Sequence, residues 1–143
     1  MADAQVAAIA HVIQLAVAPV FLISGISGML GVLTNRLTRV VDRSRKIEEL
    51  LATAGESSAS REAELRTLAY RARLTHLAIG FCAICALLIC TVVVVVFIGA
   101  SLSFNIAIAI SWLFVGAMSA FIAALLCFLR EVHLATSNLR IGT

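Results

Sequence analysis

Apolar residues are concentrated in three long runs, which lie at about residues 6–33, 77–99 and 104–129. Each run is long enough for a membrane-spanning helix, because the hydrocarbon core of a bilayer requires roughly 20 apolar helical residues. A polar segment, residues 34–76, separates the first two runs, and residues 130–143 form a tail too short for a domain. The pattern therefore predicts three transmembrane helices within a single membrane domain that covers residues 1–143.

The polar segment 34–76 keeps the spacing of a helix. A heptad-like seam runs through Leu33, Leu37, Val40, Ser44, Ile47 and Leu51, and a matching seam runs through Leu65, Leu68, Ala72 and Thr75. Between the two seams, the glycine and serines of "TAGESSAS" supply a turn. We therefore predict an all-α fold in which unbroken extensions of the first two membrane helices form a helical hairpin, with a longer arm of roughly 25–30 Å.

The composition and the distribution of charge support a membrane protein and give its orientation. The chain has 143 residues and is 62% hydrophobic, which is too apolar for one soluble core of this size. Every lysine and arginine lies at or beyond Arg36, and none lies between residues 99 and 105. By the positive-inside rule, the hairpin and the C-terminus are cytoplasmic, whereas the N-terminus and the short second connection lie outside.

Groups that could carry out chemistry are scarce in the apolar runs. His11 is the only Asp, Glu, Lys, Arg or His in any of them, which weighs against a proton pump or a coupled transporter. The chain contains no nucleotide-binding loop, no H-E-x-x-H motif and no set of metal ligands, so we expect no enzyme, catalytic residue, metal or cofactor, and no nucleic-acid partner. Cys82 and Cys85 form a C-x-x-C on one helical face and are interpreted as packing residues, with a soft-metal site as the alternative.

The first apolar run is more polar than the other two. The side chains that fall near one helical face are candidates to line a pore or cavity: His11, Gln14, Ala18, Gly25, Gly28 and Asn35. The alternative is close helix packing through small residues, which are Ser24, Ser27 and Gly31 in the first run and Gly116, Ala120 and Ala124 in the third. Pro19, the only proline, is a candidate hinge.

Basic residues gather beside the ends of the three runs. This basic collar consists of Arg36, Arg39, Arg43, Arg71, Arg73 and Arg130. One interpretation is contact with anionic lipid headgroups, at about 1 kcal/mol per basic residue near the surface. The other is an electropositive vestibule that attracts anions when several subunits surround an axis.

The stretches "APVFLISGISGMLGVLTNRLTRVVDRSR" and "LREVHLAT" together resemble an uncharacterised family of small bacterial three-span membrane proteins, domain-of-unknown-function family 2721. The run N-R-L-x-R-V-V-D-R is the most distinctive part of this resemblance, which covers nearly the whole chain. The resemblance implies a multi-pass protein of the bacterial inner membrane. It implies no activity, substrate or catalytic residue.

Three helices enclose no aqueous lumen, so conduction would require a ring of subunits. The leading hypothesis is a homo-oligomer that forms a passive ion channel, lined by the first helix, with residues 35–43 at its cytoplasmic mouth. The alternatives are a non-conducting scaffold whose cytoplasmic hairpin binds a cytoplasmic or membrane protein, and an accessory subunit of a complex whose chemistry lies on other chains.

Overall fold

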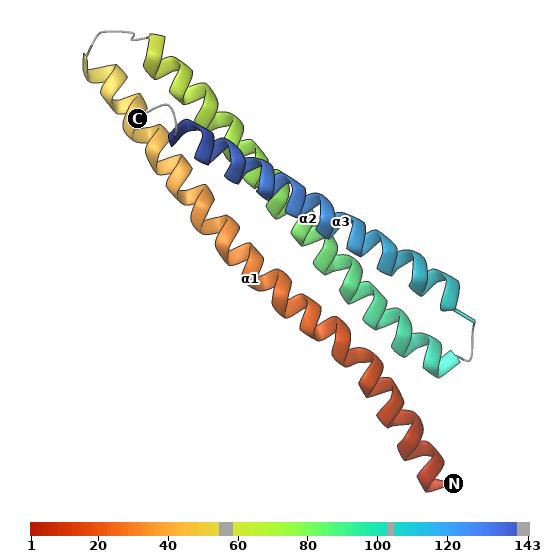
Figure 1. Cartoon of the computed structure of the whole chain (residues 1–143). Coiled ribbons are helices and arrows are strands. Elements are labelled where there is room, and N and C mark those ends of the chain that lie inside the picture. Colours follow the sequence, from red (N-terminus) through yellow and green to blue (C-terminus); the bar gives the residue numbers. More distant parts are fainter. Residues whose placement is uncertain (55–58, 103–104, 140–143) are drawn as a thin grey trace. The chain divides into compact units, whose positions relative to one another are not determined.

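The computed structural model describes residues 1–54, 59–102 and 105–139, and almost all of these residues are helical (Figure 1). The helices are α1 (Ala2–Ala54), α2 (Ala59–Leu102) and α3 (Ala107–Leu139). Each contains a stretch that is long and apolar enough to cross a membrane. The predicted all-α fold, with three helices long and apolar enough to span a membrane, is therefore confirmed. The turn predicted at Gly55 lies outside the described residues.

The change from apolar to charged sequence in residues 24–43 occurs within one unbroken helix, as predicted. Hydroxyl groups in this stretch donate hydrogen bonds to carbonyl oxygens of their own helix. Ser27, Thr34 and Thr38 each bond to the carbonyl four residues earlier, at 2.8–3.0 Å. This local bonding satisfies the hydroxyl groups without a turn or a partner. α3 is similarly continuous, and it extends beyond the apolar run that ends near Leu129.

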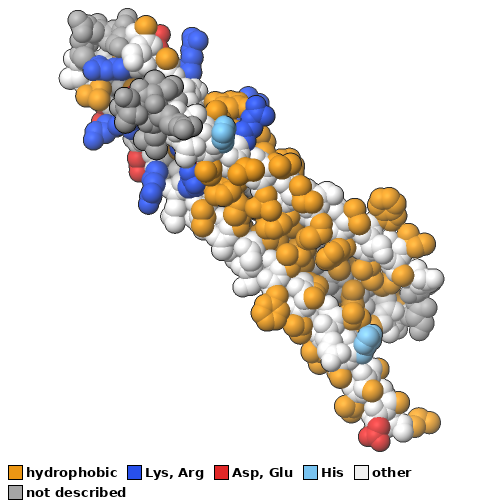
Figure 2. Space-filling model, in the orientation of Figure 1, with side chains coloured by type: hydrophobic (Ala, Val, Ile, Leu, Met, Phe, Trp, Pro, Cys, Tyr) orange, Lys and Arg blue, Asp and Glu red, His pale blue; other side chains and the backbone are white. Residues whose placement is uncertain are grey.

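The chain divides into two compact units. Unit 1 contains Met1–Met29 and Phe81–Ile122, and unit 2 contains Leu30–Gly80 and Ala123–Thr143. All lysines and arginines belong to unit 2. Figure 2 shows the contrast, because the Lys and Arg side chains of unit 2 are visible in it, whereas many of the side chains visible on unit 1 are hydrophobic.

Unit 1 has a narrow core and an apolar exterior. Its most buried side chains include Ile26 of α1, Cys82 and Cys85 of α2, and Ala117 of α3. Both thiols of the C-x-x-C are buried, as expected for packing residues. Large hydrophobic side chains such as Trp112 are exposed, as expected for a surface in contact with lipid.

The helical seams predicted for residues 33–75 form the core of unit 2. Val40 and Ile47 of α1 pack with Leu68 of α2, and the partly buried Leu51 and Leu65 pack against this cluster. The other seam positions, Leu33, Leu37, Ser44, Ala72 and Thr75, are also buried or half-buried. The three-and-four spacing puts these side chains on one face of each helix. Their packing in one cluster confirms the prediction that the two segments pack together.

Candidate functional site

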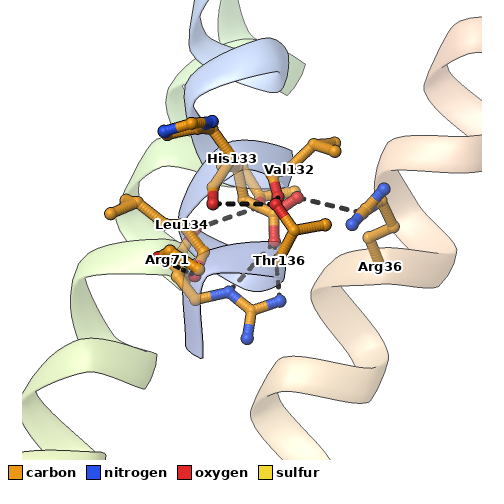
Figure 3. A network of polar contacts seen from close by, with 9 residues as sticks. Arg36, Arg71, Val132, His133, Leu134 and Thr136 are labelled. Carbon is orange, nitrogen blue, oxygen red and sulfur yellow. Dashed lines mark hydrogen bonds and ion pairs between the residues drawn. The ribbon is translucent and has the colours of Figure 1, made fainter. Parts of the chain in front are cut away.

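The most unusual side chain in unit 2 is Glu131 of α3, a carboxylate that is only 1% exposed. Arg71 of α2 donates two hydrogen bonds to Glu131 Oε1, from Nε at 3.1 Å and from Nη2 at 2.9 Å. Arg36 of α1 places its Nε 2.9 Å from the other carboxylate oxygen, Oε2. Figure 3 shows Arg36 and Arg71 reaching toward α3 from opposite sides. One carboxylate thus connects all three helices within unit 2.

The two arginines contact Glu131 in different ways. Arg71 forms directed hydrogen bonds, whereas Oε2 has no aligned hydrogen-bond partner among the described residues and is held by the charge of Arg36. The Arg36 guanidinium also lies over the ring of Phe128, 5.3 Å from its centroid, in a cation–π contact. Because Phe128 and Glu131 are three residues apart on α3, they present their side chains on the same helical face. Arg36 is therefore positioned by two neighbours on one helix.

Burial explains why Glu131 has two partners. Moving a carboxylate out of water is costly unless it is paired and hydrogen-bonded, and two guanidinium groups supply both forms of compensation. The arginine side chains remain partly exposed, at 32% for Arg36 and 19% for Arg71, so they keep some contact with solvent. The arrangement can hold helices in register and can present positive charge at the surface.

A second arginine–glutamate pair in unit 2 has almost the same geometry but lies at the surface. Arg43 of α1 donates to Glu64 Oε1 of α2 from Nε at 3.1 Å and from Nη2 at 2.9 Å. Here the side chains are 59% and 43% exposed. Exposed ion pairs contribute little to stability because water competes for both charges. This pair is therefore a natural control for the buried one.

Several residues of the basic collar meet in one open groove of about 520 Å³ in unit 2. We call it the arginine groove; its lining consists of Val32, Asn35, Arg36, Arg39, Val40, Arg43, Leu68 and Arg71. The structure thus brings four predicted collar arginines together, along with Asn35, which the sequence had suggested as a pore-lining residue. Arg73 and Arg130 are exposed and do not line this groove.

The predicted pore-lining residues of the first apolar run lie on the surface of unit 1. His11, Gln14, Ala18, Gly25 and Gly28 are all exposed. A Cβ atom added at Gly25 or Gly28 would meet nothing within 4 Å in the described structure. Ala18 additionally lines an apolar pocket of about 280 Å³ that α1 shares with α2 and α3. These residues therefore form an accessible face of α1.

Pro19, the predicted hinge, is half-buried inside an unbroken helix and lines the same apolar pocket as Ala18. The predicted packing residues of α1 are exposed: Ser24, Ser27 and Gly31. Those of α3 are more enclosed, since Gly116 and Ala120 are half-buried and Ala124 is fully buried. The Cβ position of Gly116 lies 3.7 Å from Leu88, so a small residue there allows α2 to approach closely.

Reasoning from sequence alone missed Glu131. The available signal was that Glu131 is the only acidic residue after Glu64, in a chain with eight acids. A lone carboxylate next to a long apolar run must either reach water or find a buried cation. The part of the chain that the structure describes contains no group of three or more His, Cys, Asp or Glu side chains that could hold a metal ion.

Three long apolar helices, an apolar exterior around unit 1 and arginines confined to unit 2 define a multi-pass helical membrane protein. The chain belongs to the family described as Protein of unknown function (DUF2721), whose sequence model matches residues 16–141. This match confirms the resemblance inferred from the "NRLTRVVDR" and "LREVHLAT" stretches. Comparison with curated proteins and with solved structures gave no match.

Proposed function

We propose that the protein assembles as a homo-oligomer that forms a passive ion pore lined by α1. The observation that carries this proposal is the accessible polar face of α1 in unit 1, where His11 and Gln14 are exposed. An imidazole or amide in contact with lipid lacks hydrogen-bond partners, so water or the same face of another subunit would have to satisfy it. The open space beside Gly25 and Gly28 would allow a second helix to approach closely.

In this proposal the N-terminus lies outside a bacterial inner membrane and the C-terminus lies in the cytoplasm, in accord with the positive-inside rule. Arg39 and Arg43 follow the polar face along α1 and would surround the cytoplasmic mouth. Their positive charge would concentrate anions there, so the pore should favour anions over cations.

Ion flux through liposomes that contain the purified protein tests the proposal. We expect flux above that of protein-free liposomes, and we expect Gln14→Leu to reduce it because an apolar side chain would remove a hydrogen-bonding group from the path. Ile9→Leu is the matched control, since Ile9 is an exposed residue of the same helix and the substitution keeps the position apolar. Arg39→Glu combined with Arg43→Glu should lower the anion-to-cation ratio. Flux equal to that of empty liposomes would disprove the pore.

A non-conducting scaffold or accessory subunit is the second candidate. It is supported by the packed α1–α2 pair of unit 2, which exposes Glu48 and Glu62 while Val40, Ile47 and Leu68 form its core. This function predicts that Glu48→Lys with Glu62→Lys abolishes capture of a specific membrane or cytoplasmic protein. The same variants should leave liposome flux unchanged, which separates the two candidates.

A further inference from the structure

The arginine groove has more positive charge than its neighbours neutralise. It is lined by four arginines and no acidic residue. Arg36 and Arg71 share the single charge of Glu131, and Arg43 pairs with Glu64. Two carboxylates therefore oppose four guanidinium groups, which leaves an excess of two positive charges.

Arg39 is the lining arginine without an ion-pair partner among the residues that the structure describes. It is exposed and lies on α1 between Arg36 and Arg43, each of which is anchored by a carboxylate. The anchored arginines have already lost part of their conformational freedom, so binding a ligand between them costs less entropy than ordering free side chains would. Because Arg39 is exposed and takes part in no ion pair of the described structure, it is the lining arginine most available to a ligand.

We infer that the arginine groove binds a phosphate group. Guanidinium groups present a planar fork of N–H donors that matches phosphate oxygens, and an excess of two positive charges suits a phosphate mono- or diester. Asn35 adds an amide donor to the same lining, and the side chains of Val32, Val40 and Leu68 supply apolar wall for the carbon skeleton attached to the phosphate. The volume of about 520 Å³ is sufficient for a lipid headgroup or a small soluble phosphate ester.

In this site Arg39 is the principal phosphate ligand, and Glu131 is a positioning residue that orients Arg36 and Arg71. Every lining residue and both carboxylates belong to unit 2, so the site is complete within one chain. The inference does not rest on the proposed pore, since a protomer that conducts nothing would still bind phosphate.

Two arms of one experiment distinguish a phospholipid from a soluble phosphate. The first arm uses native mass spectrometry of the full-length chain in detergent to compare retention of phosphatidylglycerol with that of phosphatidylcholine. The second arm titrates the same chain, held in phosphatidylcholine nanodiscs, with inorganic phosphate and follows binding by phosphorus NMR. In whichever arm binding occurs, Arg39→Gln should weaken it about tenfold, the effect expected for one lost charge-assisted hydrogen-bonding group.

Arg73→Gln is the matched control, because it removes the same charge from an exposed arginine of unit 2 outside the groove. It should change binding less than twofold, as expected for loss of long-range attraction alone. Arg39→Lys, which keeps the charge but loses the fork, should bind with intermediate affinity. Both Arg39 variants should melt at the parental temperature, since Arg39 has no ion pair to lose in the described structure.

Binding that Arg39→Gln weakens in the lipid arm alone would identify a phospholipid headgroup as the ligand. Binding that Arg39→Gln weakens in the phosphate arm alone would identify a soluble phosphate. Three results would overturn the site: no binding in either arm, binding that survives Arg39→Gln, or equal weakening by Arg39→Gln and Arg73→Gln. The last result would mean that the basic surface attracts anions without a defined pocket.

Discussion

Replacing Glu131 by glutamine removes the charge that Arg36 and Arg71 share while almost preserving the size of the side chain. The variant leaves two guanidinium groups facing each other across a neutral amide in a buried position. The amide oxygen can still accept both hydrogen bonds that Arg71 donates to Oε1, but it no longer balances either positive charge. We therefore expect unit 2 to lose stability through uncompensated charge, with little change in packing.

The expected magnitude follows from burial. Breaking a buried ion pair by removing one partner costs about 3–5 kcal/mol. Because Arg36 is 32% exposed and Arg71 is 19% exposed, water can recover part of this loss, and we expect about 2–4 kcal/mol for Glu131→Gln. The control is Glu64→Gln, which breaks a pair with the same nitrogen–oxygen distances, 2.9 and 3.1 Å, at an exposed position. Its cost should be about 0.2–1 kcal/mol.

The measurement is an SDS titration of each variant in mixed micelles, with helix content followed by circular dichroism. A third variant, in which Arg36, Arg71 and Glu131 are all replaced by methionine, should lose less stability than Glu131→Gln, because no buried charge is left without a partner. Equal losses for Glu131→Gln and Glu64→Gln would refute the reasoning, since burial would then make no difference. A triple variant less stable than Glu131→Gln would show that the ion pairs themselves, rather than the avoidance of unpaired charge, provide the stability.

Three other substitutions or labelling experiments test the packing of the helices. Leu68→Ala, in the core of unit 2, should cost about 2–5 kcal/mol in the same SDS titration, whereas Leu50→Ala at an exposed position should stay within about 0.5 kcal/mol. A Cβ atom added at Gly28 meets no atom within 4 Å in the described structure, so the monomer should tolerate Gly28→Leu, and loss of fluorescence energy transfer between labelled subunits of this variant would show that this face associates. In single-cysteine variants in detergent, maleimide should modify the exposed Cys90 faster than the buried Cys82, and equal rates would contradict the unit 1 core.

Short-range patterns allowed much of the fold to be predicted. The continuity of α1 through residues 24–43 follows from the absence of glycine or proline between Gly31 and Val40 and from hydroxyl groups that bond to their own helix. The seam from Leu33 to Leu51 follows from three-and-four spacing, which places its members on one helical face whatever they contact. Both features depend on residues within a few positions of each other.

The candidate site was less accessible to this reasoning. The arginines of the basic collar could be identified by their clustering, and four of them line the arginine groove. Their carboxylate partner could not be assigned, because Glu131 lies 60 residues from Arg71 along the chain and no local pattern links the two. Similarly, helical periodicity placed His11 and Gln14 near one face but could not tell whether another helix of the same chain covered that face.

The sequence by itself determined that three helices are apolar enough to span a bilayer, that α1 and α2 each carry a seam of mostly apolar residues on one face, and that lysine and arginine are confined to Arg36 and the residues after it. Hydrophobic transfer and backbone hydrogen bonding act on each segment separately, so these properties need no knowledge of the other segments. Only the tertiary structure decided which arginines share the carboxylate of Glu131 and which face of α1 stays exposed in unit 1. Those outcomes depend on which helix faces are brought together, and desolvation then makes the pairing of a buried charge obligatory.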